Sequence, residues 1–179
     1  MIKLYKILVL ALLFLSPGIS YGAQVELQSL DPSLSPGEVF VVDLKLNTEG
    51  ESINALEGKV LYDPLYFEVL AFDVSKSFIS FWLENPAVSA LGTVVFSGVA
   101  PGGISARDSN IFYFTLRAKQ KGNTDIKLKD VNLYINDGAG TLAKTTVKNE
   151  ALSISGELNE QSVVASDDKT PPETFKITR

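Results

Sequence analysis

Apolar residues recur at every second position along much of this chain, and residues that favour turns interrupt the pattern at short intervals. The clearest stretch is residues 112–118, where Phe112, Phe114 and Leu116 alternate with Tyr113 and more polar residues. Successive side chains of a β-strand point to opposite faces, so this spacing predicts strands with one buried face. The same reasoning predicts further strands at residues 40–47, 56–62 and 70–74, the last with Leu70, Phe72 and Val74 on its buried face. The valine-rich residues 93–99 are predicted to form a buried strand.

Short sequences rich in proline, glycine and asparagine separate the predicted strands. They are Ser35-Pro36-Gly37, Asp63-Pro64, Pro101-Gly102-Gly103, Lys121-Gly122-Asn123 and Asn136-Asp137-Gly138. These residues fix or tolerate the dihedral angles of tight turns. Short strands with such turns predict an all-β domain over residues 23–156, built as a two-sheet antiparallel jelly-roll sandwich of about nine strands.

The alternation also predicts the core and one irregularity. Ile126 and Leu128 occupy even positions, whereas Val131 and Leu133 occupy odd ones, so a β-bulge or corner is expected near Lys129-Asp130. The predicted core consists of inward-facing side chains: Phe40, Leu44, Val60, Phe96, Phe112, Phe114 and Leu116.

Composition removes several classes of function. The 179 residues include neither cysteine nor histidine, which excludes disulfides, thiol nucleophiles, Ser-His-Asp triads and zinc sites with thiolate or imidazole ligands. A net charge of −5 argues against electrostatic binding to nucleic acid. A glycosidase needs two carboxylates about 5–10 Å apart across a cleft. The acidic residues here stand singly at turns and outward positions, so we predict no enzyme and no cofactor.

The N-terminus resembles a signal peptide. Lys3 and Lys6 precede an apolar run of nine residues, 7–15, which is too short to cross a bilayer of about 30 Å. We predict that residues 1–22 are removed, with cleavage after Gly22 or Ala23, and that the protein is secreted, extracellular or on the cell surface. An uncleaved membrane anchor is the alternative. Cleavage would change the net charge from −5 to −7 by removing two lysines.

The C-terminal part, residues 157–179, has little to bury and contains Asp167-Asp168-Lys169-Thr170-Pro171-Pro172-Glu173. Paired prolines resist both helices and central strands, so this part is predicted to be a disordered linker or tail. A linker normally leads to another module. The sequence therefore favours a fragment of a longer modular protein over a simple disordered end.

The order of the motifs adds a family resemblance. In chain order they are Ser35-Pro36-Gly37-Glu38, an alternating strand, residues 53–62 leading into Asp63-Pro64, Phe67-Glu68-Val69-Leu70, Val94-Val95-Phe96, Gly102-Gly103, residues 111–119, Gly122 and Asn136-Asp137-Gly138. In this order and spacing, residues 25–155 resemble a cohesin domain. Cohesins share a nine-stranded jelly roll with several families of carbohydrate-binding modules.

The resemblance implies a non-catalytic binding module. Cohesins bind dockerins, which are small calcium-loaded helical pairs carried by polysaccharide-degrading enzymes, and the calcium belongs to the dockerin. The contacting face is one flat sheet, and the positions that match it here are Ala55, Glu57, Lys59, Ser97, Val99 and Pro101. Glu57 agrees with the family's acidic residue, whereas Ala55 and Pro101 replace an amide and an acidic residue. A solvated outer face without a partner is the alternative for all six positions.

Two other functions remain open. A carbohydrate-binding module would bind polysaccharide directly through exposed rings, and Trp82 is the candidate ring, although a lone tryptophan in a small sandwich is more often part of the core. A surface adhesion module with another ligand is the second possibility. Asp130, Asn136 and Asp137 carry oxygens that suit calcium but lack EF-hand spacing, so turns are predicted there and no metal site. We expect a monomer.

Overall fold

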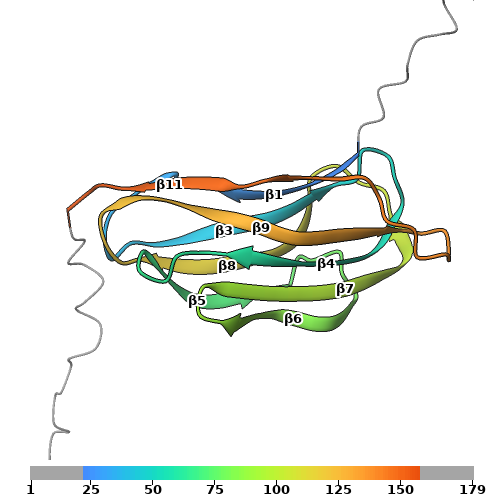
Figure 1. Ribbon diagram of the computed structural model, residues 1–179, viewed down its shortest axis with the longest axis horizontal. Coiled ribbons are helices and arrows are strands. Elements are labelled where there is room, and N and C mark those ends of the chain that lie inside the picture. The colour runs from blue at the N-terminus through green and yellow to red at the C-terminus, as the bar shows by residue number, and fades with distance from the viewer. Residues whose placement is uncertain (1–21, 158–179) are drawn as a thin grey trace, which may run out of the picture.

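The computed structural model describes residues 22–157 and shows an all-β domain of two packed sheets (Figure 1). The predicted signal peptide and the predicted C-terminal linker lie outside the described residues, except for Gly22 and Glu157 at their borders. None of the residues from 22 to 157 forms a helix long and apolar enough to cross a membrane.

The five-stranded sheet has the strand order β10-β1-β3-β8-β5. Its strands are β1 (Ala23–Ser29), β3 (Val39–Asn47), β5 (Phe67–Asp73), β8 (Ser109–Ala118) and β10 (Thr145–Lys148). The six-stranded sheet has the order β2-β11-β9-β4-β7-β6. Its strands are β2 (Ser33–Leu34), β4 (Ile53–Leu61), β6 (Phe81–Ala90), β7 (Thr93–Ile104), β9 (Gly122–Ile135) and β11 (Glu150–Ile154).

The predicted fold class is confirmed, with two differences in detail. The described residues contain eleven strands rather than about nine, because β2 has only two residues and the C-terminal stretch divides into β10 and β11. Both sheets are also mixed rather than purely antiparallel, since β1 pairs with β10 and β2 pairs with β11 in parallel.

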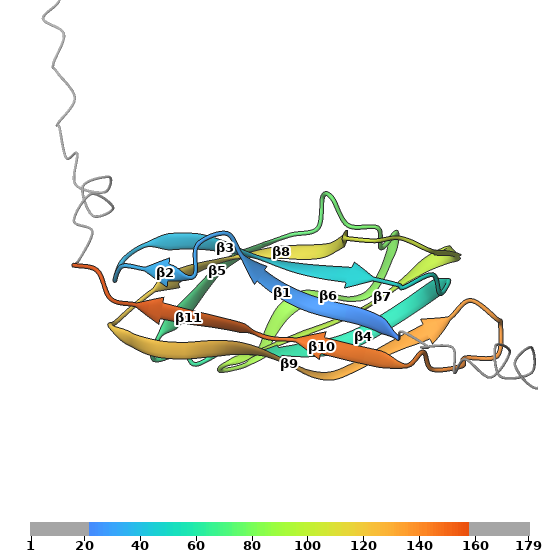
Figure 2. The same ribbon diagram turned by 90° about the horizontal axis from the view of Figure 1, so that it is seen from above.

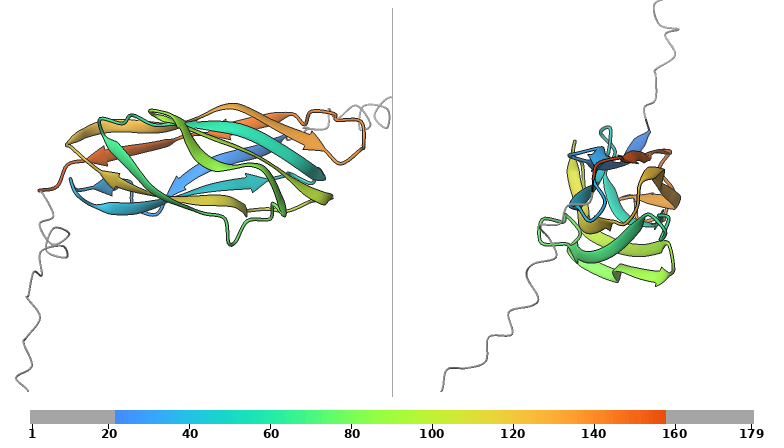
Figure 3. Two further views of the ribbon diagram at one scale, coloured as in Figure 1. Left: turned by 90° about the horizontal axis from the view of Figure 1, so that it is seen from below. Right: turned by 90° about the vertical axis from the view of Figure 1, so that its left-hand side faces the viewer.

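The C-terminal stretch connects the two sheets along one side of the sandwich. β10 pairs with β1, and directly after Asn149 the chain continues as β11 beside β9 (Figure 2). The Asn149 side-chain oxygen accepts a hydrogen bond of 2.9 Å from the Leu128 backbone N–H. This bond fixes the residue at which the chain passes from one sheet to the other. On the opposite side of the sandwich the sheets end at β5 and β6 (Figure 3).

The core fills the space between the sheets as the alternation predicts. Phe96 of the six-stranded sheet meets Phe112 of the five-stranded sheet edge to face, with ring centroids 5.3 Å apart. Such edge-on contacts suit the charge distribution of aromatic rings and add to the gain from burial. Every predicted core residue is at most 7% exposed: Phe40, Leu44, Val60, Phe96, Phe112, Phe114 and Leu116.

Two bulges change the alternation. In β9 the pairing moves from Glu57–Asn132 to Lys59–Lys129, so Asp130 and Val131 both lie opposite a single residue, and the predicted bulge is confirmed. In β5 the register shifts between residues 69 and 71, which turns Leu70 outward to 40% exposure. The predicted inward position of Leu70 is therefore wrong, because one extra residue in a strand reverses the facing of its neighbour.

Candidate binding face on the six-stranded sheet

The outward side chains of β9, β4, β7 and β6 form one continuous surface, which we call the outer face. Ala55, Glu57 and Lys59 lie on β4, where their neighbours Leu56 and Val60 are buried in the core. Ser97 and Val99 alternate in the same way on β7, and Pro101 follows them in an exposed position. The structure thus brings all six predicted docking residues onto two adjacent strands. Their role in docking stays a prediction.

Cross-strand pairing arranges the outer face in rows that run across the strands, because residues directly opposite each other share a face. The apolar row contains Tyr134, Ala55, Val99 and Phe81. The acidic row contains Asn132, Glu57, Ser97 and Glu84. The lysine row contains Lys129, Lys59, Val95 and Ala87. Each row differs from the next in chemistry, so the face changes from apolar to acidic to basic along the strands.

Glu57 is held in place by two neutral donors from β9. The Asn132 side-chain amide and the Tyr134 hydroxyl each donate a hydrogen bond of 2.9 Å to its Oε1 atom. The hydrogen bond to Glu57 favours the protonated phenol and raises the pKa of Tyr134. Because both bonds end on Oε1, they orient the carboxylate without using Oε2.

Lys59 is paired with the bulge residue Asp130. Its Nζ atom lies 2.9 Å from Asp130 Oδ2, and about half of each side chain is exposed. This hydrogen bond raises the pKa of Lys59 and lowers the pKa of Asp130, since each charge stabilises the other. Asp130 occupies the left-handed region, with φ of 51°, which the bulge imposes. The charge of Lys59 is therefore balanced within the face.

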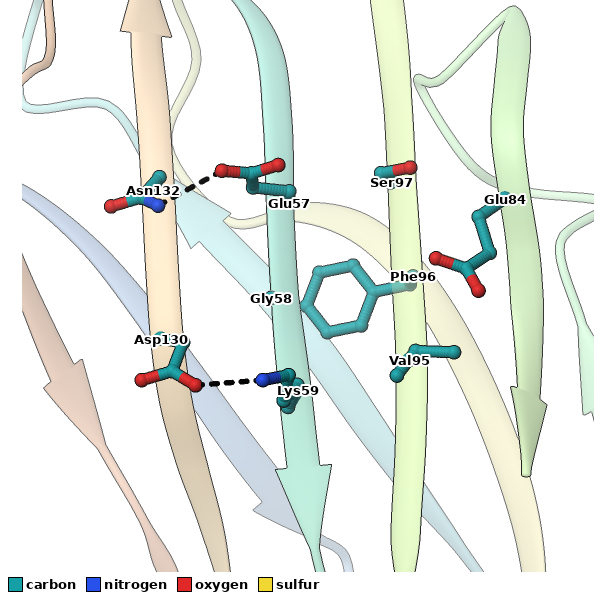
Figure 4. Close-up of a pocket in the computed structure, with 9 residues that line it drawn as sticks. All are labelled: Glu57, Gly58, Lys59, Glu84, Val95, Phe96, Ser97, Asp130 and Asn132. Carbon is teal, nitrogen blue, oxygen red and sulfur yellow. Dashed lines mark hydrogen bonds and ion pairs between the residues drawn. The ribbon is translucent and has the colours of Figure 1, made fainter. Parts of the chain in front are cut away.

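A shallow depression of about 270 Å³ lies at the centre of the outer face (Figure 4). Glu57, Lys59, Ser97 and Glu84 surround it, and the ring of Phe96 approaches Gly58 from the core side. A Cβ atom on Gly58 would lie 2.7 Å from Phe96 Cζ and 3.2 Å from Val131 Cγ2. Glycine is needed here because of space rather than backbone conformation.

Sequence and structure comparisons place this geometry among known folds. No protein-family model and no curated protein matches the sequence. A type I cohesin–dockerin complex from Clostridium thermocellum matches with a TM-score of 0.66 and 16% identity, over 78% of this chain and 96% of that chain. A non-cellulosomal cohesin from Archaeoglobus fulgidus matches with a TM-score of 0.61 and 16% identity, over 80% and 96% of the two chains. This chain has the cohesin fold.

A third structure extends the cohesin comparison. The cohesin module of a family 33 glycoside hydrolase from Clostridium perfringens matches with a TM-score of 0.59 and 14% identity, over 75% of this chain and 98% of that chain. The fold that the motif order implied is therefore confirmed, although few residues are shared.

Within this cohesin fold, Trp82 and Phe81 take opposite positions. Trp82 lies opposite Gly98, is partly buried and packs against the core. A Cβ atom on Gly98 would lie 2.5 Å from Ile79 Cγ2 and 3.2 Å from the Trp82 ring, so the space between Gly98 and these side chains is already filled. Phe81 points outward instead and is 59% exposed. The exposed ring of the outer face is thus Phe81, and Trp82 has the position of a core residue.

Sequence reasoning missed four members of the apolar and acidic rows. Asn132 and Tyr134 were recoverable, because the odd-numbered apolar residues of β9 require these even-numbered ones to face outward. Phe81 and Glu84 left no such signal, since the register of β6 against β7 shifts after Trp82 and again after Glu84.

The residues that were considered for calcium have other partners. Asp130 pairs with Lys59, and Asn136 donates to the Gly102 carbonyl oxygen at 2.9 Å. Asp137 accepts the Ala139 N–H at 2.8 Å within its own turn, and a hydrogen bond from Thr141 lowers the pKa of Asp137. In the described residues, no group of three or more acidic side chains is placed to hold a metal ion.

Proposed function

We propose that this chain is a non-catalytic binding module that docks a dockerin-bearing protein on the outer face. The observation that carries the proposal is Glu57, an outward carboxylate oriented by Asn132 and Tyr134 at the centre of a flat four-stranded surface. A side chain that is already ordered loses little conformational entropy when a partner binds. Central, well-ordered residues of this kind contribute most of the affinity of protein interfaces.

The fold comparisons support the kind of partner. Several of the solved cohesins with this fold are bound to dockerins, including the Clostridium thermocellum complex and a cohesin from Acetivibrio cellulolyticus. A face of four strands and three rows suits an interface of standard size, about 800 Å² on each partner. Association through this face requires no catalytic group and no bound cofactor.

We place the module outside the cytoplasm, in a polysaccharide-degrading or cell-surface assembly. The support for export is the basic and apolar character of residues 1–22, and the support for a modular context is the linker-like composition of residues 157–179. Mass spectrometry of the exported protein tests the first point. A mature N-terminus at Ala23 or Gln24 is expected, and an intact Met1 would contradict it.

A pull-down with the purified mature protein tests the partner. Secreted proteins of the producing organism and insoluble polysaccharides are offered separately, each with and without a calcium chelator. A protein partner that is lost on chelation is expected, because a dockerin needs its calcium to fold. Retention on polysaccharide alone would favour a carbohydrate-binding module, with Phe81 as the ring to replace. Binding to neither would favour an adhesion module with another ligand.

A further inference from the structure

An apolar groove lies on the side of the sandwich where both sheets end. β5 ends the five-stranded sheet and β6 ends the six-stranded sheet, and among the described residues neither has a second neighbouring strand (Figure 3). The groove has a volume of about 460 Å³ and is lined by Phe67 and Val69 of β5, by Val88 of β6 and by Leu91. We call it the edge groove. Leu91 is 83% exposed and Val88 is 45% exposed. An unpaired strand edge beside exposed apolar side chains gains free energy when another strand covers it.

The edge of β5 determines what kind of segment fits the edge groove. β5 contains no proline, whereas β6 contains Pro86, which has no N–H to offer a neighbouring strand. Phe67 is buried, and Val69, two positions further on, packs against the core. A strand added beside β5 would place its own alternate side chains about 4.8 Å from these two, facing the groove. The fitting segment therefore has two apolar side chains with one residue between them.

The residue between Phe67 and Val69 sets the charge of that segment. Glu68 points outward, its side chain is about half exposed, and its Oε2 atom pairs with Arg117 at 2.8 Å. Opposite charges that lie side by side on neighbouring strands attract each other. A cation between the two apolar residues would therefore lie beside Glu68, whichever direction the added strand takes.

The described part of the chain ends close to the edge groove. Glu157 pairs with Lys121 at 3.1 Å, and a Cβ atom on the adjacent Gly122 would lie 2.5 Å from the Tyr66 ring. The Tyr66 carbonyl oxygen accepts a hydrogen bond of 2.8 Å from the backbone N–H of Lys119, which lines the groove. The residues that follow Glu157 therefore start only a few side chains away from it.

One segment of the C-terminal part has the required pattern. In Thr174-Phe175-Lys176-Ile177-Thr178, aromatic and β-branched residues of high strand propensity surround a single lysine. Residues 158–173 connect this segment to the domain. A flexible linker of that length has an average span of roughly 20–25 Å, which is enough to reach the neighbouring groove. Tethering also raises the effective concentration of the segment, so a weak contact suffices.

We infer that residues 174–178 dock in the edge groove as an additional strand beside β5, with Phe175 and Ile177 facing Val88 and Leu91 and with Lys176 beside Glu68. The chain would thereby cover its own unpaired edge, which otherwise invites pairing with other proteins. This docking involves the side of the sandwich and leaves the outer face free, so it holds or fails independently of the proposed function.

A spin label tests the inference, because the absence of cysteine allows a single one to be placed. Thr178→Cys carries the label on the isotope-labelled mature protein, and NMR line broadening reports which amides lie near it. The amides of Phe67, Val69, Val88 and Leu91 should broaden, and that of Ser97 on the outer face should not. Exchange gives a second measurement. The β5 amides should exchange roughly tenfold more slowly in the full mature chain than in a chain ending at Glu157.

Paired substitutions separate docking from mere proximity. Phe175→Ser with Ile177→Ser should abolish the selective broadening, whereas Val163→Ser with Val164→Ser removes the same kind of side chain from the linker and should leave it unchanged. Lys176→Glu should reduce the broadening, because the new carboxylate would lie beside Glu68. Lys169→Glu makes the same change of charge within the linker and should have no effect.

Three results would overturn the inference. Equal amide exchange in the full and shortened chains would mean that the edge of β5 stays open. Broadening that persists after both serine substitutions at residues 175 and 177 would mean that the label is near the groove without docking. Broadening that appears when spin-labelled protein is mixed with isotope-labelled, unlabelled-spin protein would mean that the segment of a second copy fills the groove.

Discussion

The solvent-facing sides of the two sheets differ in how their charged side chains are paired. On the five-stranded sheet, Arg117 pairs with Glu68 at 2.8 Å and Lys45 pairs with Asp108 at 2.9 Å. On the six-stranded sheet, the central carboxylate of Glu57 is held by an amide and a phenol, and among residues 22–157 no cation pairs with it. On the five-stranded sheet these charged side chains form ion pairs with each other. On the outer face of the six-stranded sheet, Glu57 keeps an oriented negative charge beside exposed apolar residues. This difference identifies the face that suits a partner.

The largest expected effect lies in the core that both faces share. Replacing Phe114, which is fully buried, by alanine should lower the free energy of unfolding by about 3–5 kcal/mol, because a cavity remains between the sheets. Its outward neighbour Thr115 is the control, and Thr115→Ala should cost less than about 1 kcal/mol. Denaturant unfolding measures both. A loss below about 1 kcal/mol for Phe114 would mean that the two faces are assigned the wrong way round.

A smaller effect is expected at Gly58, where the core reaches the outer face. Gly58→Val should destabilise the protein by about 1–3 kcal/mol, because the new side chain overlaps the Phe96 ring. Combining it with Phe96→Leu should restore part of the loss, since the smaller side chain can make room. A double-mutant cycle from denaturant unfolding measures this coupling. Strictly additive losses would show that Phe96 is not the obstacle.

The two faces should respond differently to the loss of one carboxylate. Glu57→Gln should weaken partner binding roughly tenfold, because a central oriented charge is removed. Glu68→Gln, on the face with matched charges, should leave binding unchanged. Stability should change by less than about 1 kcal/mol in both variants, since both side chains lie at the surface. Equal effects on binding from the two substitutions would remove the distinction between the faces.

The smallest expected effect is the change in the free energy of unfolding on acidification. The contributions of Asp130 on the six-stranded sheet and Asp43 on the five-stranded sheet should have opposite signs. The Lys59 hydrogen bond lowers the pKa of Asp130, so its stabilising contribution is present above the usual aspartate pKa and is lost as pH falls through the lowered value. Desolvation raises the pKa of Asp43 on the five-stranded sheet, so stability gains from its protonation as pH falls through the raised value. Carboxyl NMR titration should show the two shifts.

Substitution by asparagine checks the signs. Asp130→Asn should flatten the loss of stability on acidification, and Asp43→Asn should remove the opposing gain, as thermal unfolding at several pH values would show. A pKa below the usual aspartate value at Asp43 would mean that its cation Lys45, rather than burial, dominates there.

The fold was largely predictable from the sequence, and the binding face was predictable only in part. Alternation in β3, β4, β7 and β8 is a local property, so the inward position of residues such as Phe112 follows from neighbours in the chain. Leu70 failed this reasoning because a bulge reversed its side. Trp82 and Phe81 were ambiguous for the same reason, since the register of β6 against β7 shifts three times.

The sequence by itself determined the period-two strands, the turns between them, the chemistry excluded by the lack of cysteine and histidine, and the outward positions of Glu57 and Lys59. The tertiary structure alone decided what stands opposite them. Asn132 and Tyr134 lie 75 and 77 residues from Glu57 along the chain, yet both hydrogen-bond to it. Register between such distant strands depends on bulges and on the packing of the shared core, which no local pattern specifies.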